Sequence, residues 1–421
     1  MRATLCLIAT LLGLPATVRA EAPNPEREAL AAYKAKDYPT FLQAMRLVEA
    51  RDPAVPRVVY NVASAEALAG SPDDAVRILA RLASTGLSFA IAKDDDFRGL
   101  AKRADFQAVL RTMKQNLAPR GKATPAATLR ERDLLAEGVA YDAASKTMFV
   151  SSVRHRKIVA IDDHGKQRDF IPEAQDGIGG VFGIAVDPTR HVLWASSTRL
   201  PHMLGYRAAD KDVSGVFKYE LATGKLLASY LLPADGQPHA LGDVVLAANG
   251  DVYTSDSATP TLYRIAAATD KLEPFVDHGF LSLQGMALSA DDKLLYVADY
   301  ARGLYTLDLV TKELARLDPP AGIATTGIDG LYLHRGRLVA TQNGTEPQRV
   351  VEFTLSPSGR SLISQQVLLS GDPRARDLSL GVVVDDVFYL NAAAGWVHYD
   401  DNGVAKPGAA APHVILQIAL P

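Results

Sequence analysis

Three polar residues stand where apolar strands are expected to begin. Glu137 precedes glycine in "LLAEGVAYDAASKTMFVSSV", Gln284 precedes glycine in "QGMALSADDKLLYVADY", and Asp329 precedes glycine in "DGLYLHRGRLVATQNG". Two carboxylates brought together would repel and raise each other's pKa. A divalent cation would remove that repulsion, and ligands that are all oxygen favour a hard ion such as calcium, magnesium or manganese. Such an ion could polarise a carbonyl group or lower the pKa of a bound water.

These three stretches belong to a set of six that share one pattern. Each has a leading residue, an apolar strand, a polar turn and a second strand that ends in a small or polar residue, and most are followed by a third strand such as "KIVAID". Sheet units that recur at roughly 40–60 residues are typical of a β-propeller. Residues 133–421 are therefore predicted to form a six-bladed β-propeller, so that the fold class is mainly β. The leading residues of the six units are Glu137, Phe182, Gly242, Gln284, Asp329 and Leu380.

Propeller geometry would place the leading residues around one axis, because the innermost strand of every blade lines the central channel. Glu137, Gln284 and Asp329 are therefore expected to meet at the channel mouth and to bind a divalent metal ion. The alternative is that these side chains are solvated there without an ion. The last strand, "HVILQIALP", either closes the ring by joining a blade built from the other end of the chain or forms a loose tail.

The pattern of the N-terminal residues predicts that the protein is exported. Residues 1–20, "MRATLCLIATLLGLPATVRA", combine an early arginine, an apolar run and a small-residue ending, which is typical of a cleaved secretory signal peptide. The apolar run is short for a membrane-spanning helix, so no membrane anchor is expected in the mature chain. Cys6 is the only cysteine and would leave with the signal peptide. We expect a secreted protein, located in a bacterial periplasm.

A helical region precedes the propeller. Residues 25–118 are rich in Ala, Leu and charge with helical spacing, and Gly70 follows Lys36 by 34 residues in two similar helix–turn–helix stretches. That period predicts a small all-α, tetratricopeptide-like domain. Residues 119–132 mix Pro, Gly, Ala and charge without periodicity and are predicted to be a linker. The helical repeats either bind a protein partner or simply pack beside the propeller.

Composition and motifs exclude several classes of function. A formal net charge of −3 with only short basic stretches provides no field for nucleic-acid binding. The sequence contains no G-x-S-x-G, H-E-x-x-H or P-loop motif, which argues against a serine-hydrolase elbow, a zincin and a P-loop nucleotide site.

The blades, and "AEGVAYD" in particular, resemble the family of senescence-marker protein (regucalcin), gluconolactonases and related lactonases. The resemblance covers residues 133 to the end of the chain and not the helical region. It implies a hydrolase of a sugar lactone or similar small ester that depends on a divalent metal ion, with calcium expected. The family's metal ligands are a Glu, an Asn and an Asp, which fall on Glu137, Gln284 and Asp329. The family's general base falls on Asp329, which is therefore the expected catalytic residue.

Two departures from the family pattern concern the site. Gln284 is one methylene longer than the family's Asn. Gly242 stands where the family has a substrate-contacting Asn, and Ala240 stands where family enzymes often carry an Arg. Contacts to the small-molecule substrate are expected instead from Asp243, His239 and Arg199.

Two functions remain open on the sequence alone. One is the metal-dependent lactonase, and the other is a non-catalytic propeller that binds a small molecule or a protein, with the helical repeats as a second interaction surface. An insertion in the second blade, "TRLPHMLGYRAADKD", is the best candidate for a lid over the mouth.

Overall fold

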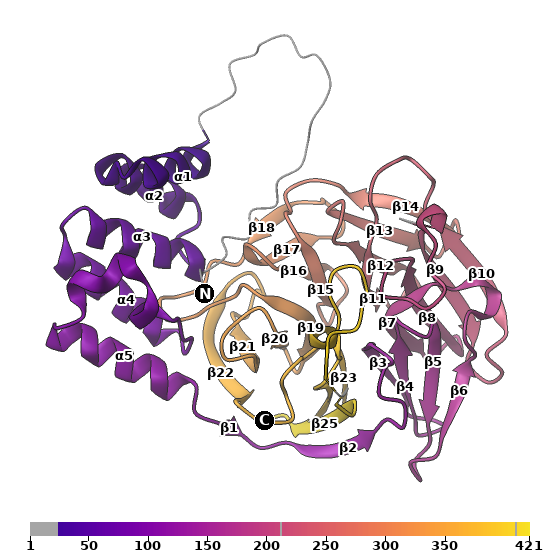
Figure 1. Cartoon of the computed structure of the whole chain (residues 1–421). Coiled ribbons are helices and arrows are strands. Elements are labelled where there is room, and N and C mark those ends of the chain that lie inside the picture. The colour runs from indigo at the N-terminus through magenta and orange to yellow at the C-terminus, as the bar shows by residue number, and fades with distance from the viewer. Residues whose placement is uncertain (1–23, 211–212, 409–410) are drawn as a thin grey trace.

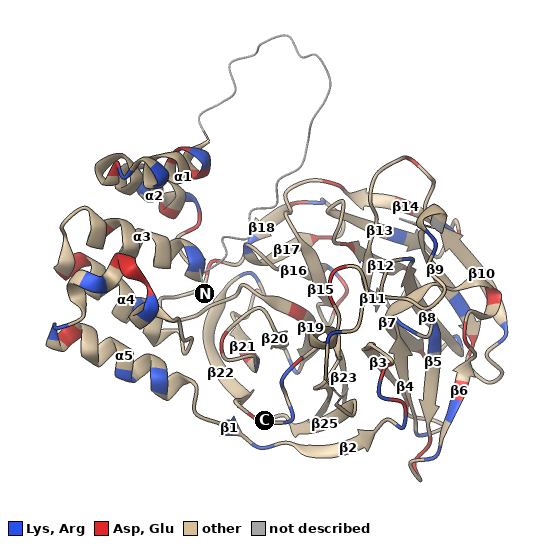
Figure 2. Cartoon of the chain, viewed as in Figure 1, with Lys and Arg blue, Asp and Glu red and all other residues tan. Residues whose placement is uncertain are grey.

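The computed structural model describes residues 24–210, 213–408 and 411–421, and the predicted signal peptide of residues 1–20 lies outside them. Helices of the N-terminal part lie beside a ring of β-sheets (Figure 1). Acidic and basic residues are interspersed along both parts (Figure 2). Within the described ranges, no helix is both long enough and apolar enough to cross a membrane.

The helical part, which we call the helical module, begins with capped helices. The side chains of Asn24 and Asp37 accept hydrogen bonds from backbone N–H groups in the first turns of α1 and α2, and proline occupies the first turn of α1 to α4, where its missing N–H costs nothing. Lys36 and Gly70 both adopt left-handed backbone conformations where a helix ends, in agreement with the repeat inferred from the sequence. The predicted helical region is confirmed, while its assignment as tetratricopeptide-like stays a prediction. The elements are α1 (Pro25–Ala35), α2 (Tyr38–Arg51), α3 (Pro56–Leu68), α4 (Pro72–Ser84), the 3₁₀ helices η1 (Ile91–Lys93) and η2 (Asp95–Leu100), and α5 (Ala104–Asn116).

Six antiparallel sheets form the ring, which confirms the six-bladed propeller. In each blade the strands are ordered from the channel outward. Blade one is β3 (Ala136–Asp142), β4 (Thr147–Ser152), β5 (Lys157–Ile161) and β6 (Gln167–Ile171); blade two is β7 (Gly180–Asp187), β8 (Val192–Thr198), β9 (Ser214–Glu220) and β10 (Leu226–Leu231); blade three is β11 (Leu241–Leu246), β12 (Val252–Asp256), β13 (Thr261–Ala266) and β14 (Lys271–Val276). Blade four is β15 (Leu283–Leu288), β16 (Leu294–Asp299), β17 (Gly303–Asp308) and β18 (Leu314–Arg316); blade five is β19 (Ile328–His334), β20 (Arg337–Gln342), β21 (Arg349–Leu355) and β22 (Leu362–Ser370); blade six has β23 (Gly381–Val384), β24 (Val387–Asn391) and β25 (Val414–Ala419).

The ring is closed by pairing the two ends of the chain. In blade six, β25 from the C-terminal sequence pairs with β2 (Thr124–Thr128), the outermost strand, with Ala127 opposite Ile415. β1 (Arg120–Gly121) adds a fifth strand to blade five. The segment predicted to be a linker therefore contributes strands to two blades. β2 is almost entirely exposed at a sheet edge, so it lacks the alternation of apolar residues that identifies a half-buried strand.

Apolar side chains between neighbouring blades hold the ring together. Phe149 and Ile158 of blade one, for example, pack in one buried cluster with Leu193 and Phe217 of blade two. Close packing of this kind resists deformation, so the inner strands and the residues that begin them are held in fixed positions around the channel.

The helical module contacts blades four and five. Arg316 of β18 forms an ion pair with Asp52, 2.9 Å from Nη1 to Oδ1. The buried Arg349 of β21 donates from Nη1 to the carbonyl oxygen of Thr85, at the C-terminal end of α4, over 2.9 Å. A positive charge at this end of a helix is favoured by the helix dipole, so the contact helps to fix the module on the propeller.

Candidate functional site at the channel mouth

β-bulges shape the starts of the inner strands that carry the polar leading residues. The register shifts between Ala136 and Val139, so Glu137 lies within a bulge, and equivalent shifts flank Gln284 and Asp329. A bulge locally disrupts the ladder and re-aims side chains. The bulges therefore explain how a polar residue can begin an otherwise buried strand.

The glycines that follow Glu137 and Gln284 are required by close packing between blades. A Cβ atom on Gly138 would lie 2.4 Å from the carbonyl oxygen of Phe182, and one on Gly285 would lie 2.6 Å from the carbonyl oxygen of Asp329. In both cases the obstructing atom belongs to the leading residue of the next blade. The Glu-Gly and Gln-Gly pairs thus reflect the packing of consecutive leading residues around the channel.

All six leading residues line one cavity of about 210 Å³. The structure therefore brings together Glu137, Gln284 and Asp329, which are far apart in the sequence, as predicted. Their roles in metal binding and catalysis remain predictions. The remaining lining residues are Ala240, Leu241, Asp243 and Ser257.

Glu137 is buried and held by an aromatic donor. The indole Nε1 of Trp396, in the 3₁₀ helix η5 (Trp396–His398) of blade six, donates to Oε2 of Glu137 over 2.8 Å. Burial and, secondarily, the charge of Asp329 raise the pKa of Glu137, although the hydrogen bond from Trp396 acts in the opposite direction. A carboxylate in this position gains from any cation that reaches the cavity.

Asp329 is oriented by an amide. Nδ2 of Asn343 donates to Oδ2 of Asp329 over 2.7 Å, and Oδ1 of Asn343 accepts from the hydroxyl of Tyr300 over 2.9 Å. Burial raises the pKa of Asp329, the hydrogen bond from Asn343 opposes this rise, and the charge of Asp377 adds to it. Among the described residues, no donor is directed at Oδ1 of Asp329, so this oxygen can interact with a ligand.

The donor atoms of this site fit a hard divalent cation. Glu137 and Asp329 provide carboxylate oxygens, Gln284 can provide an amide oxygen, and burial disfavours the charged state of both carboxylates. Calcium and magnesium prefer such ligands and complete their coordination with water. In the described part of the chain, no set of three or more His, Cys, Asp and Glu side chains is placed to hold a metal ion, so a site here would combine two carboxylates with other oxygen ligands, such as the amide of Gln284 and water.

The three residues predicted to contact substrate occupy different places. Asp243 lines the cavity, but its carboxylate accepts from the backbone N–H groups of Val244 (2.9 Å) and Met286 (3.0 Å), and burial raises its pKa to about 7. His239 is buried and does not belong to the cavity lining. Arg199 lines a different cavity.

The ring of His239 lies between two carboxylates. Nδ1 is 2.6 Å from Oδ2 of Asp256, and Nε2 is 3.2 Å from Oδ1 of Asp235. Burial lowers the pKa of His239, but the hydrogen bonds and charges of Asp256 and Asp235 outweigh burial, and the pKa is raised. These contacts give the imidazole a structural role at the edge of blade three.

Two residues at the site were not predicted. Asn343 directly follows β20, which pairs with β19, the strand that carries Asp329. Its position in this hairpin could have been used to predict it from the sequence. Trp396 reaches Glu137 across 259 residues of sequence, from the irregular segment between β24 and β25. No local pattern identifies a contact of this kind.

A family model described as "SMP-30/Gluconolactonase/LRE-like region" matches residues 135–359, which are 225 of the 421 residues. The match includes Glu137, Gln284 and Asp329. A comparison with curated proteins found no significant match.

Solved structures of similar fold carry different names. A putative glucose dehydrogenase from Thermus thermophilus has a TM-score of 0.50 and 15% identity, covering 71% of this chain and 100% of that one. A gluconolactonase from Xanthomonas campestris has a TM-score of 0.47 and 16% identity, covering 72% and 99%. A calcium-binding regucalcin from Agrobacterium tumefaciens has a TM-score of 0.48 and 15% identity, covering 70% and 94%. At these identities the likeness concerns the propeller fold alone.

Proposed function

Because the chain belongs to the SMP-30/gluconolactonase/LRE-like family, we propose that it is an exported, metal-dependent hydrolase of a sugar lactone or a similar small ester. The observation that carries this proposal is the meeting of Glu137, Gln284 and Asp329 in one cavity. Two carboxyl groups whose pKa values are raised by burial, together with an amide, offer the oxygen ligands that calcium prefers.

The residues at the channel mouth would have different roles in this reaction. Glu137, Gln284 and Asp329 hold the ion, and Trp396 keeps the carboxylate of Glu137 in one orientation through its indole N–H. When bound, a divalent ion would polarise the carbonyl group of the ester and lower the pKa of a bound water. Such support of a ligand by a neighbouring donor is common in metal sites.

Asp329 is the proposed general base. Asn343 holds its Oδ2, so Oδ1 is the oxygen that would accept a proton from the attacking water. A base is most effective when its pKa lies near the working pH. Burial raises the pKa of Asp329 in the ion-free site, and a bound cation would act in the opposite direction, so that the two effects together would set the pKa of the base.

The cavity favours a small substrate. Its volume of about 210 Å³ is below the roughly 300–1,000 Å³ of pockets that hold drug-sized ligands. Phe182 and Leu380 offer apolar wall, and Ser257 offers a hydroxyl. Both carboxylate oxygens of Asp243 already accept backbone N–H groups, so Asp243 would shape the wall while Ser257 provides a polar contact.

Export and the role of the helical module belong to the same proposal. The signal-like residues 1–20 support secretion to the periplasm. The helical module lies on one side of the ring (Figure 1), and its outer surface is proposed as a site for a protein partner.

The test combines metal content with turnover. Protein purified without chelator should contain about one calcium per chain and should open sugar lactones in a pH-stat assay, with turnover abolished by EDTA and restored by calcium. Glu137→Ala should lose both the metal and the turnover. The matched control is Glu313→Ala, which removes an exposed carboxylate and should retain both. Metal-free protein without turnover on any lactone would instead favour a non-catalytic binding propeller.

A further inference from the structure

The short helix that carries Trp396 is anchored by a carboxylate from another segment of blade six. Oδ2 of Asp377, which lies between β22 and β23, accepts from the backbone N–H of Gly395 over 2.7 Å and from that of Val397 over a longer 3.4 Å. Gly395 and Val397 are the neighbours of Trp396 at the start of η5. The first N–H groups of a helix have no acceptor within it, so Asp377 provides the acceptor from outside.

The residues just before η5 are held at further points. Asp377 forms an isolated β-bridge with Ala393. The carbonyl oxygen of Ala393 also lies 2.7 Å from Nδ1 of His413, whose Nε2 accepts from the backbone N–H of Leu134 over 3.1 Å. Leu134 precedes Glu137 by three residues. The segment that leads to Trp396 is therefore fixed to the start of blade one, where Glu137 lies.

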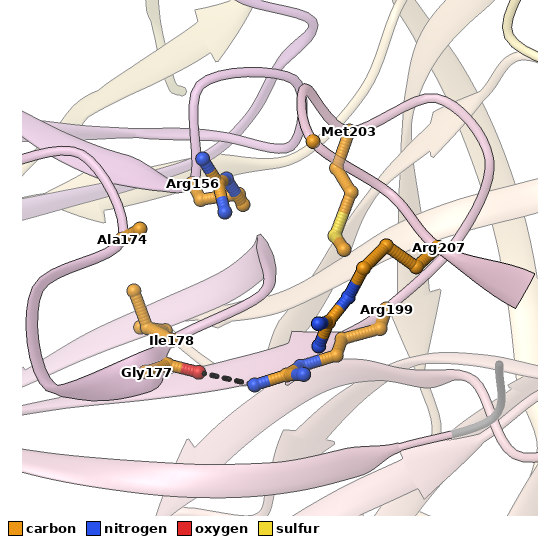
Figure 3. Close-up of a pocket in the computed structure, with 8 residues that line it drawn as sticks. Arg156, Ala174, Gly177, Ile178, Arg199, Met203 and Arg207 are labelled. Carbon is orange, nitrogen blue, oxygen red and sulfur yellow. Dashed lines mark hydrogen bonds between the residues drawn. The ribbon is translucent and has the colours of Figure 1, made fainter. Parts of the chain in front are cut away.

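The indole ring of Trp396 packs against two other rings. Its centroid lies 6.3 Å from that of Phe182 and 5.0 Å from that of His202. His202 belongs to the β8–β9 loop, in which the next residue, Met203, points into a cavity of about 230 Å³ between blades one and two (Figure 3). These contacts restrict the plane of the indole, whereas its N–H meets Oε2 of Glu137 only while η5 stays in place.

Asp377 acts on the mouth cavity from a distance, because it is not among the described residues that line this cavity. Burial is the main cause of the raised pKa of Glu137 and of Asp329, and the charge of Asp377 adds to the rise in both. A negative charge at this place also favours a cation in the cavity. A role through the position of Trp396 must therefore be separated from a role through charge.

We propose that Asp377 is a positioning residue of the channel mouth, whose carboxylate holds η5 so that the indole N–H of Trp396 meets Glu137. The geometry of the three residues carries this proposal. Its consequence for calcium rests on the proposed function. A donor that is held in place restricts the carboxylate of Glu137 to one orientation, so less freedom is lost when an ion binds.

The fluorescence of Trp396 measures its position directly. The chain has two tryptophans, so Trp194→Phe leaves Trp396 as the only one. Among the described residues Nε1 of Trp194 has no hydrogen-bond partner, and this background change therefore removes no hydrogen bond. With EDTA present, Asp377→Ala should shift the emission of Trp396 to longer wavelength and increase its quenching by acrylamide, because the released indole gains contact with water.

Three more variants complete the fluorescence experiment. Asp377→Asn keeps an oxygen acceptor at the same place and should restore most of the original emission. Asp377→Ser, whose hydroxyl ends one bond short of the carboxylate oxygens, should shift the emission as Asp377→Ala does. The matched control is Asp401→Ala, which removes an exposed carboxylate from the same β24–β25 segment and should leave the emission unchanged.

Calcium titration by calorimetry separates position from charge. Asp377→Ala and Asp377→Asn remove the same charge, so any difference between them reports the hydrogen-bond acceptor alone. Asp377→Ala should bind calcium about threefold to tenfold more weakly than Asp377→Asn, as the loss of one ordinary hydrogen bond implies. Combined with Trp396→Phe, the two variants should bind calcium equally, because no indole N–H remains to be positioned.

The outcomes distinguish this proposal from the proposed function. The proposal is overturned if Asp377→Ala and Asp377→Ser leave the emission of Trp396 unchanged, if Asp377→Asn shifts it equally, or if the difference in calcium affinity persists with Trp396→Phe. If the unchanged chain binds no calcium but the emission shifts as expected, the proposed metal site is refuted, whereas the positioning of Trp396 by Asp377 is supported.

Discussion

Asp243 offers a sharp test of the electrostatics at the channel mouth. Its carboxylate lines the cavity and accepts from the backbone N–H groups of Val244 and Met286. Burial raises its pKa from an ordinary value of 3.8 to about 7, and the charge of Asp329 contributes to this rise. Asp243→Asn removes the ionisable group while preserving the size of the side chain.

The expected effect depends on pH in a defined direction. A pKa that is higher in the folded than in the unfolded chain means that the folded protein holds an extra proton between the two values, so the unchanged protein loses stability as pH rises through this window. Between pH 5 and pH 6 the difference is close to one proton, and it falls to about half a proton at pH 7. At ~1.4 kcal/mol per pH unit, the free energy of unfolding attributable to Asp243 should therefore fall by about 3 kcal/mol between pH 5 and pH 8.

The substitution also has a constant cost. Because Asn has one oxygen and one NH₂ group, Asp243→Asn leaves one backbone N–H without its acceptor, which costs about 1–3 kcal/mol. That cost is the same at both pH values and cancels in the comparison. Relative to the unchanged protein, Asp243→Asn should thus gain about 3 kcal/mol of stability on going from pH 5 to pH 8.

Urea unfolding of the mature chain with EDTA present, at pH 5 and pH 8, measures this difference. Asp401→Asn, which changes an exposed aspartate in a loop of blade six, is the control and should show no comparable dependence on pH. If Asp243→Asn changes the free energy of unfolding equally at both pH values, Asp243 is not held in its protonated form by burial and the reasoning is wrong.

Three further predictions concern the metal, the aromatic donor and the module. Calcium should raise the melting temperature more at pH 8 than at pH 5, because the raised pKa of Glu137 keeps this ligand protonated at low pH. Equal shifts at both pH values, or a shift that survives Glu137→Gln, would contradict the site. Trp396→Phe, which removes the donor to that carboxylate, should weaken calcium binding about tenfold in calorimetry, whereas the buried Trp194→Phe control should bind normally. Arg349→Met should weaken the docking of the helical module on the propeller by about 1–3 kcal/mol and should speed tryptic cleavage between α5 and β2. Cleavage no faster than in the control Arg360→Met, which changes an exposed arginine, would argue against this contact.

The sequence predicts the blades because each blade repeats one local pattern. Apolar residues at strand spacing and a polar turn recur six times, a third strand follows most of these units, and the structure forms a sheet from each unit. The outermost strand of blade six could not be recognised in this way. β2 is exposed along nearly its whole length, so its partner β25, and not its own composition, determines that it forms a strand.

The candidate site likewise has a part that could be predicted from the repeat and a part that could not. The polar leading residues could be predicted because equivalent positions in a repeat occupy equivalent positions around the axis, and Glu137, Gln284 and Asp329 do share one cavity. The partners that orient them depend on loops, which differ between blades. Asn343 could have been predicted from its place in the hairpin, whereas the contact of Trp396 depends on the conformation of a single irregular loop.

The helical module is also connected to the site, through the loop between β20 and β21. This loop carries Asn343, which orients Asp329, and its Glu346 accepts a hydrogen bond at the carbonyl oxygen from the backbone N–H of Ser88 in the module, over 2.7 Å. The loop ends at Arg349, which is anchored to the end of α4. A hydrogen bond such as that from Asn343 is effective only if its donor is held in place. Docking of the module at two points therefore restrains the loop that positions Asp329, and links a domain outside the family match to the chemistry expected within it.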